Sequence, residues 1–278
     1  EVHPELFATV TERAERELPK DPRGIAKLYL QDVRGLNITR IGDFYQNRYT
    51  HKATGETTAT VRFPMPKGSN NSEDGWWERL VEEVDDAPKN NIKPGYSYRG
   101  LAWLPQGFEP KGVGKIWIVE GIFDALALMH HGITAISVIS CRNFPGETLD
   151  WIQRENPMVE LVFAYDSDPD GKAFLKRHLR QATDQYSFPK IRAAISGSDQ
   201  DWNDLHLNGS LTESDLKHYL YLGGLLTART KEQYALIMWA RKKWTQFFME
   251  FDYKTYWCKL KRFLMKTARL GWWRRWTS

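Results

Sequence analysis

Three aspartates alternate over five positions directly after an apolar run in LVFAYDSDPDG, residues 161–171. They are Asp166, Asp168 and Asp170. Like charges so close together repel one another, and a chain tolerates them where a cation lies among them or where water screens them fully. The apolar run before them has the composition of a buried strand. The pattern therefore suggests a cation site at the end of a strand.

A calcium loop is one interpretation of this segment. Asp166, Asp168, Asp170 and Gly171 match positions 1, 3, 5 and 6 of an EF-hand loop. The position that requires a bidentate Glu is occupied by Arg177. The segment on the N-terminal side is rich in strand-forming residues, where an EF-hand needs a helix. The pattern therefore does not support an EF-hand.

The first half of the chain has few signals of secondary structure. A helix is expected over 24–36, with Ile25, Leu28, Leu30 and Val33 on its apolar side. A strand is expected over 57–66, and a strand or turn over 96–105.

Predicted strands and helices alternate from residue 115 onward. The strands are expected at 115–121, 135–140, 159–166 and 190–196, and the helices between them at 122–132, 146–156 and 170–182. Such alternation predicts βαβ units and a parallel sheet flanked by helices. In an open parallel sheet, ligands bind at the carboxyl ends of the strands.

Acidic residues are predicted at several of these strand ends. Glu120 ends the first strand, Asp166 ends the third, and Asp201 follows the fourth. Asp124 lies one helical turn after Glu120 and can face the same way. Any one of these acids alone would be read as a solvated loop residue or a helix cap. Together, and without His or Cys, they predict a Mg²⁺ or Mn²⁺ site with oxygen ligands.

Three acidic motifs resemble those of a Toprim domain in order and spacing. They are VEGIFDAL, FAYDSDPDGKA and GSDQDWNDLHLNG, within residues 113–210. In that family a Glu-Gly pair ends the first motif's strand and an Asp-x-Asp pair ends the third strand. Glu120-Gly121 and Asp166-x-Asp168 fit both features. The family includes DnaG-type primases, topoisomerases and some nucleases, and DWNDLHLNG is most similar to the primase half of phage primase-helicases.

The first half of the chain has looser similarity to the N-terminal half of DnaG-type primases. The similar stretches are YLQDVRGLNITRIGDFY, TVRFPMPKG and SYRGLAWLP. The resemblance implies a basic groove for template and nucleotide. The candidates for phosphate or template contacts are Arg34, Arg62, Lys67, Arg99 and Lys172. Arg99 is the basic residue nearest the position of a family Lys and departs from that pattern.

The resemblance also implies a fold class and a domain order. The expected fold is α/β, with a Rossmann-like parallel Toprim sheet flanked by helices, an N-terminal α+β primase subdomain and a C-terminal helical region. We expect a leader helix at 1–20, the primase subdomain at 21–112, the Toprim catalytic domain at 113–210, and a basic, Trp-rich helical region at 211–278.

The activity implied by the resemblance is that of a DNA primase: template-directed synthesis of short primers on single-stranded DNA by two-metal nucleotidyl transfer. The catalytic residues would be Glu120, Asp166 and Asp168. Two Mg²⁺ or Mn²⁺ ions would be held by these three and by Asp170 and Asp201, with Asp124 and Asp204 orienting the ligands. Two alternatives stay open, namely a Toprim-family metal-dependent nuclease and a non-catalytic nucleic-acid-binding replication subunit.

Amino-acid composition indicates the class of protein and its compartment. At 41% hydrophobic and 27% charged, the 278 residues have the balance of an ordinary globular protein. Two cysteines, Cys141 and Cys258, exclude a disulfide framework and a cysteine-rich zinc site in this stretch, and favour a reducing, cytosolic compartment. The family resemblance implies no zinc in this stretch and the cytoplasm of a bacterium or phage-infected host. No apolar run approaches the ~20 residues that cross a bilayer. The family resemblance implies DNA and NTPs as substrates, and a helicase or a separate zinc-binding module as a partner. The missing initiator Met suggests a processed or excised fragment.

The end of the chain differs in charge from the rest. Residues 227–278 hold 13 Lys and Arg against 3 Asp and Glu, and six of the twelve Trp. A basic, Trp-rich tail after an acidic body favours contact with a polyanion such as single-stranded DNA. A helical bundle with solvated cations is the alternative. Trp239, Trp244 and Trp257 have the spacing of a helical core, whereas Trp272, Trp273 and Trp276 are the better candidates for stacking on bases.

Overall fold

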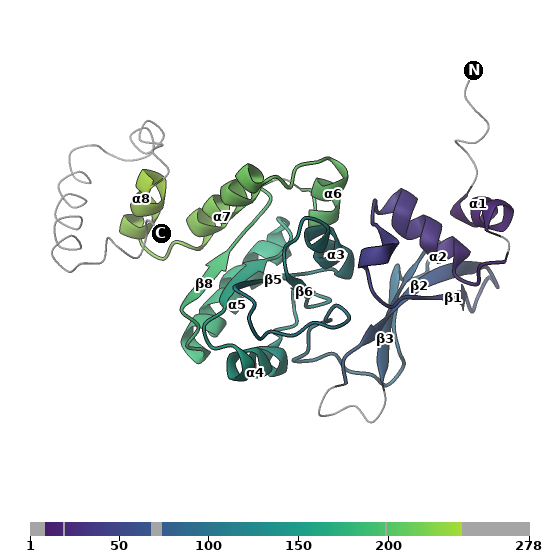
Figure 1. The fold of residues 1–278 in the computed structure, drawn as a ribbon, viewed down its shortest axis with the longest axis horizontal. Helices are drawn as coiled ribbons and strands as arrows, with labels where there is room; N and C mark the ends of the chain where they lie inside the picture. The colour runs from purple at the N-terminus through teal and green to yellow at the C-terminus, as the bar shows by residue number, and fades with distance from the viewer. Residues whose placement is uncertain (1–8, 19, 68–73, 198, 241–278) are drawn as a thin grey trace, which may run out of the picture.

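Two four-stranded sheets lie side by side in the computed structural model, which describes residues 9–18, 20–67, 74–197 and 199–240 (Figure 1). The first sheet is antiparallel, with strand order β1-β2-β3-β4. The second is parallel, with strand order β6-β5-β7-β8. The expected α/β fold with a helix-flanked parallel sheet is therefore confirmed.

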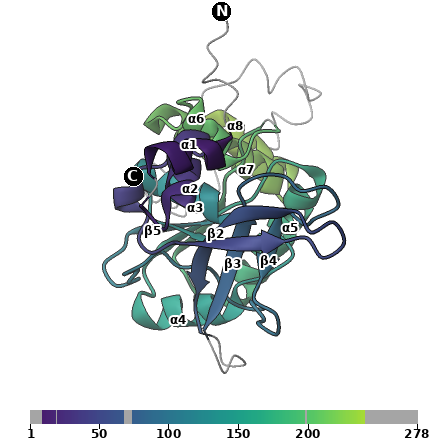
Figure 2. The same ribbon diagram turned by 90° about the vertical axis from the view of Figure 1, so that its right-hand side faces the viewer.

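The antiparallel sheet is built around its longest strand. It consists of β1 (Tyr45–Thr50), β2 (Thr57–Met65), β3 (Gly75–Leu80) and β4 (Asn90–Ile92), seen face-on in Figure 2. The strand predicted over 57–66 is confirmed as β2, because β-branched residues alternate there with buried Val61 and Phe63. The other three strands were not predicted. Strands β1 and β4 contain no buried residue, whereas β3 was missed although most of its residues are buried. The segment 96–105 forms turns, with one bridge from Trp103 to Ser137.

Short helices precede this sheet. Helix α1 (Val10–Glu17) begins with a capping box between Thr9 and Glu12. Helix α2 (Gly24–Leu28) continues as a π-helical turn over Tyr29–Val33, and a 3₁₀ turn follows at Ile38–Arg40.

The prediction of a single helix over 24–36 is partly wrong. It stops at Val33, and the wider π turn rotates the helix face so that Val33, expected on the apolar side, is 43% exposed.

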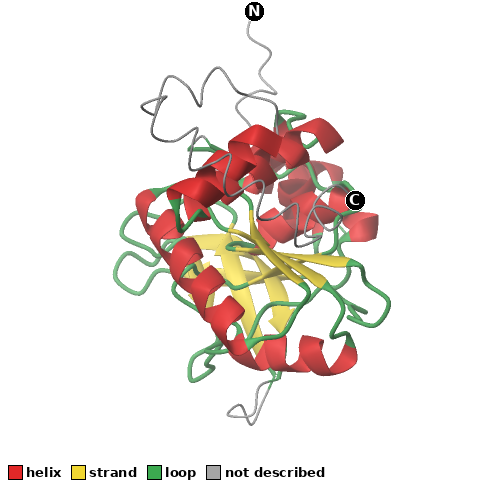
Figure 3. Cartoon of the chain, turned by 90° about the vertical axis from the view of Figure 1, so that its left-hand side faces the viewer, coloured by secondary structure: helices red, strands yellow, loops and turns green. Residues whose placement is uncertain are grey.

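The parallel sheet separates two layers of helices, and Figure 3 shows helices on both sides of it. Its strands are β5 (Lys115–Val119), β6 (Ala135–Ser137), β7 (Glu160–Ala164) and β8 (Lys190–Ala193). The helices that connect them are α3 (Ile122–His130), α4 (Gly146–Glu155) and α5 (Pro169–Gln185), and α6 (Trp202–Leu207) follows the last strand.

Alternate residues of each strand supply the two layers. Ile116 and Ile118 share a buried cluster with residues of α4 and α5, whereas Trp117 and Val119 share one with residues of α3 and α6. Both faces of the sheet are therefore covered, as parallel sheets require.

Helix α3 joins the two sheets. The ring of Phe123 lies 6.0 Å from Tyr29, 6.0 Å from Phe63 on β2 and 5.8 Å from Trp77 on β3, centroid to centroid. These residues belong to one buried cluster that includes β5, β7 and α6. The antiparallel and parallel sheets therefore share a hydrophobic core.

The helices after residue 209 are α7 (Glu213–Thr227) and α8 (Lys231–Ala240). The basic, Trp-rich segment that follows, including Trp244, Trp257, Trp272, Trp273 and Trp276, lies outside the described residues, as does the start of the leader. Among the described residues no helix has the length and apolarity to cross a bilayer. The expected domain boundaries remain predictions.

Candidate active site

Two acids stand at the carboxyl ends of adjacent parallel strands. Glu120 follows β5 and Asp166 lies two residues after β7, and the two strands pair in register up to Val119 and Ala164. One oxygen of each side chain, Glu120 Oε2 and Asp166 Oδ1, is buried without a hydrogen-bond partner in the described structure. A buried, unpartnered carboxylate oxygen is costly unless a cation or a proton meets it.

The pKa values of Asp166 and Glu120 are consistent with two buried acids lying close together. Burial raises the pKa of Asp166 from 3.8 to about 7, and the neighbouring charge of Glu120 adds to the effect. Burial also raises the pKa of Glu120, opposed by a backbone hydrogen bond from Cys141 and reinforced by Asp168 and Asp170. The site therefore favours either a bound proton or a bound cation.

Asp168 and Asp170 lie at the start of α5. The Asp168 side chain is the N-cap and accepts from the backbone N–H of Gly171 at 2.6 Å. Gly171 is required there, because a Cβ atom would lie 2.3 Å from the carbonyl oxygen of Asp166. Asp170 is exposed, and Arg142 Nη2 lies 3.5 Å from its Oδ2. The helix thus uses part of the Asp168 carboxylate, and Asp170 faces solvent.

Asp201 and Asp204 form a reciprocal cap at the start of α6. Asp201 Oδ1 accepts from the Asp204 backbone N–H at 2.7 Å, and Asp204 Oδ2 accepts from the Asp201 N–H at 3.4 Å. Burial raises the pKa of Asp201. The indole N–H of Trp202 donates to the carbonyl oxygen of Ala164 at 2.7 Å, which ties α6 to the end of β7. Both acids therefore lie at the same sheet edge as Asp166.

Asp124 is buried behind the other acids. Its two oxygens accept from the backbone N–H groups of Gly121, at 3.0 Å, and Asn203, at 3.1 Å. Burial and the charges of Asp166 and Asp201 raise its pKa well above 3.8. With both oxygens used by the backbone, Asp124 links the Glu-Gly turn to α6.

Asn203 connects Asp124 to Arg34, and no role for it was predicted from the sequence. Its Oδ1 accepts from Arg34 Nη1 at 3.2 Å, and its Nδ2 donates to the Arg34 carbonyl oxygen at 3.0 Å. The Arg34 guanidinium also lies 4.5 Å from the centroid of the Phe123 ring. Burial raises the pKa of Asp201, and the positive charge of Arg34 partly opposes this rise. These contacts hold Arg34, a predicted basic residue, beside the carboxylate cluster. The only signal for Asn203 was its place within DWND.

The loop between β6 and α4 also borders the site. Ser137 Oγ donates to the carbonyl oxygen of Glu120 at 2.7 Å. Ile139 has φ +70°, a strained value for a β-branched residue. Burial, reinforced by Glu120, raises the pKa of the Cys141 thiol to about 12, so this buried thiol stays protonated. The sequence carried no signal for this support of Glu120.

The donor set fits a hard divalent cation in its chemistry. It offers carboxylate oxygens only, and two of these are buried without a donor. Within the described ranges, no three His, Cys, Asp or Glu side chains are grouped closely enough to hold one ion. The predicted ligand set of Glu120, Asp166, Asp168, Asp170 and Asp201 thus remains a prediction.

The other predicted basic residues lie in three different places. Arg62 donates to Glu78 Oε2 at 2.9 Å and stacks 3.7 Å from the Trp76 ring, so it neutralises a buried acid within the antiparallel sheet. Lys67 is exposed just after β2, and Lys172 is half-buried in the first turns of α5. Arg99 lines a groove between α4 and α5.

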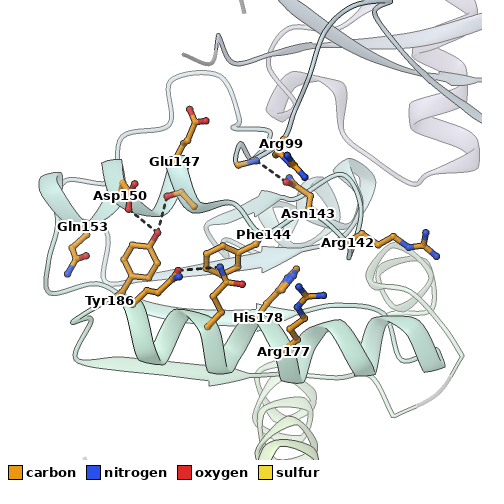
Figure 4. A pocket seen from close by; sticks show the side chains of 14 residues that line it. Arg99, Arg142, Asn143, Phe144, Glu147, Asp150, Gln153, Arg177, His178 and Tyr186 are labelled. Atoms are coloured by element: carbon orange, nitrogen blue, oxygen red, sulfur yellow. Dashed lines mark hydrogen bonds between the residues drawn. The ribbon is translucent and has the colours of Figure 1, made fainter. Parts of the chain in front are cut away.

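That groove has a volume of about 670 Å³. Figure 4 shows Arg99, Arg142 and Arg177 toward one end, and Glu147, Asp150 and Tyr186 toward the other, with Phe144 between. Because Arg142 also approaches Asp170, the basic end adjoins the acidic strand ends.

Comparison with known proteins agrees with this geometry. Residues 117–206 match the family model described as Toprim-like, so this part of the chain is a Toprim-like domain. It contains Glu120, Asp166 and Asp201. No curated protein sequence matches the chain.

Solved structures extend the similarity beyond that domain. The RNA polymerase domain of Mycobacterium tuberculosis primase DnaG, in complex with a double-stranded DNA oligomer with a 6-nucleotide overhang, is 16% identical with a TM-score of 0.50, covering 94% of this chain and 93% of that one. The primase fragment of the bacteriophage T7 primase-helicase protein is 15% identical with a TM-score of 0.44, covering 67% and 72%. The first of these two structures shows that the Toprim-like domain lies within the fold of a DnaG-type primase RNA polymerase domain.

Proposed function

We propose that this protein is a DNA-directed nucleotidyltransferase that synthesises short primers on a single-stranded DNA template. The observation that carries the proposal is the pair of buried carboxylate oxygens, Glu120 Oε2 and Asp166 Oδ1, that lack donors at the ends of neighbouring parallel strands. Such oxygens suit a hard divalent cation, and nucleotidyl transfer depends on one. The shared fold with primase domains is consistent with this reaction.

The carboxylates would hold two Mg²⁺ or Mn²⁺ ions, with Glu120, Asp166 and Asp168 central and Asp170 and Asp201 completing the set. When bound, such ions activate a 3′-hydroxyl and neutralise the charge of a leaving pyrophosphate. Asp124 and Asp204 act through hydrogen bonds to the backbone of the strand-end loops and of α6. They fix the loops that carry the ligands.

Arg34 is the strongest candidate for a contact with nucleotide phosphate. Its guanidinium is oriented by Asn203, Tyr29 and Phe123. A cation held beside an acidic cluster can bind a phosphate that also meets the metal ions. Lys67, Arg99 and Lys172 remain candidates for template contacts, whereas Arg62 is already bound to a buried acid.

The proposed substrates are NTPs and single-stranded DNA. In this role the protein would work in the cytoplasm of a bacterium or phage-infected host. A separate zinc-binding module would select initiation sites, and a replicative helicase would be another partner. Whether the nucleotides are rNTPs or dNTPs depends on contacts to the sugar.

Asp166→Asn tests the proposal. This substitution keeps the side-chain volume but removes the charge of the central carboxylate. We expect labelled primers from the wild type with Mg²⁺ or Mn²⁺, single-stranded DNA of mixed sequence and NTPs, and at least a hundredfold less product from the variant, since metal-bound carboxylates carry several kcal/mol of transition-state stabilisation. Asp184→Asn, on the exposed face of α5, is the matched control and should retain activity.

Other outcomes would assign another function. Metal-dependent shortening of the DNA without synthesis would identify a nuclease. Salt-sensitive DNA binding without either activity, tested with the purified zinc module or helicase added, would identify a binding subunit.

A further inference from the structure

The groove between α4 and α5 lies outside the carboxylate cluster, and only Arg99 of its lining is also a candidate template contact in the proposed reaction. It is lined by Arg99 and Gly100, by the β6–α4 loop, and by one face each of α4 and α5, and it has a volume of about 670 Å³. That volume lies in the range of small-molecule sites. The groove opens on the helix layer formed by α4 and α5, while its basic end adjoins the acidic cluster through Arg142 and Asp170.

Charge is distributed unevenly along this groove. Arg99, Arg142 and Arg177 lie toward one end (Figure 4). His178 adds no charge there at neutral pH, because burial lowers its pKa to about 4. The three guanidinium groups come from three different segments of the chain, so they do not simply follow one helix face. A phosphate group is the ligand that such a cluster recognises.

The opposite end offers aromatic and polar groups. Phe144 and Tyr186 are half-buried, with ring centroids 6.4 Å apart. The Tyr186 hydroxyl donates to Asp150 Oδ1 at 2.9 Å and fixes that carboxylate in the groove wall. Asp150 and Glu147 present acceptors for amino groups (Figure 4). A base with exocyclic amino groups has the chemistry for this end, because aromatic side chains supply stacking surfaces for bases.

We propose that this groove is a nucleotide-binding site distinct from the carboxylate cluster, with the phosphate at Arg99, Arg142 and Arg177 and the base toward Phe144, Tyr186 and Asp150. The ligand is either a free nucleoside triphosphate or one nucleotide of a single strand. Both sources have the same chemistry, namely a phosphate next to a base. Binding here requires no metal ion and does not depend on the proposed primer synthesis.

Binding in the presence of a chelator tests the site. EDTA removes the metal-dependent contribution of the carboxylate cluster, and titration calorimetry then measures the affinity for ATP and for a short oligodeoxythymidine. We expect Arg177→Glu to weaken binding of the bound ligand roughly tenfold, since a charged phosphate contact is lost. Arg180→Glu is the matched control, because Arg180 is exposed on α5 one turn away and does not line the groove. Both variants change the net charge equally.

Comparing ATP with the oligodeoxythymidine distinguishes a free nucleotide from a nucleotide of a single strand. Arg177-sensitive binding of ATP would identify a free nucleotide, and Arg177-sensitive binding of the oligonucleotide alone would identify a strand. Inorganic tripolyphosphate should bind more weakly than ATP, because it lacks a base. Equal effects of Arg177→Glu and Arg180→Glu would overturn the site, and so would no binding of either ligand. Tripolyphosphate binding as tight as ATP would overturn the nucleotide assignment.

The Asp166→Asn variant separates this inference from the proposed function. It lacks the central carboxylate but keeps every residue that lines the groove. Groove binding by Asp166→Asn that equals the wild type is therefore expected whether or not the protein makes primers. Binding in EDTA that disappears in Asp166→Asn would place the nucleotide at the carboxylate cluster and overturn the separate site.

Discussion

Asp166 is an acid whose charged form is disfavoured by burial and by neighbouring carboxylates. Its pKa is raised to about 7 by burial and by Glu120, against an ordinary value of 3.8. The folded protein therefore binds this proton more tightly than the unfolded chain does. The resulting contribution to stability is full below about pH 4 and is lost as the pH rises through 7. A bound cation would replace the proton at higher pH.

This raised pKa predicts a pH-dependent gain in stability for Asp166→Asn. In chelator, the difference in Tm between the variant and the wild type should grow by a few degrees from pH 5 to pH 8, because only the wild type loses the proton. Mg²⁺ at pH 8 should reduce the difference, since it stabilises only the wild type. Thermal melts followed by circular dichroism measure it, with Asp184→Asn as control. A difference independent of pH would contradict a raised pKa.

At the scale of elements, α6 is the piece that aligns the acidic edge. This short helix carries Asp201, Asn203 and Asp204, and it is tied to β7 by the hydrogen bond from Trp202 to Ala164. The Trp202 ring also packs against Trp117 and Tyr219, each at a centroid distance of 5.5 Å. The buried indole is therefore a main contact that positions α6, together with the hydrogen bonds of Asn203 to Asp124 and Arg34.

Trp202→Phe should therefore disturb both stability and activity. The variant leaves the Ala164 carbonyl oxygen without its donor, at a cost of about 1–3 kcal/mol in urea unfolding. Primer synthesis should fall about tenfold or more, since small misplacements of reacting groups are costly. Trp151→Phe is the control, because Trp151 is half-buried on α4, and this variant should change activity little. Unchanged synthesis by folded Trp202→Phe would show that α6 does not position the site.

At the scale of the whole molecule, the antiparallel sheet and the Toprim-like domain are joined through Phe123. Its ring contacts residues of the π-helical turn, β2 and β3, while α3 itself packs on β5 and α6. Arg34 lies against the same ring. The alignment of the basic residue with the acidic cluster therefore depends on the contact between the two sheets.

Phe123→Ala should weaken that contact. Loss of this buried ring is expected to cost about 3–5 kcal/mol in urea unfolding. Synthesis by the folded fraction should also drop, because Arg34 loses its stacking partner. Phe188→Ala is the matched control, since Phe188 is equally buried but packs in the other core cluster, with Tyr186. If both variants lose stability alike but keep full specific activity, the contact between the sheets does not position Arg34.

The sequence by itself determined the parallel half of the fold. Each strand and helix predicted between residues 115 and 196 is present, because their apolar periods and Gly breaks are local signals. It also placed Glu120, Asp166 and Asp201 at one edge, since parallel strands end together. Polar strands such as β1 and β4 were missed, because such edge strands have little local pattern.

Only the tertiary structure decided how the acids and cations are paired. Arg34 meets Asn203 across 169 residues of sequence, and Arg62 binds Glu78 when the strands align. The groove between α4 and α5 is lined by three arginines and two aromatic rings that come from separate segments of the chain. Local propensity carries no information about such pairings. They follow from burial of the shared core, which fixes distances between residues far apart in the chain.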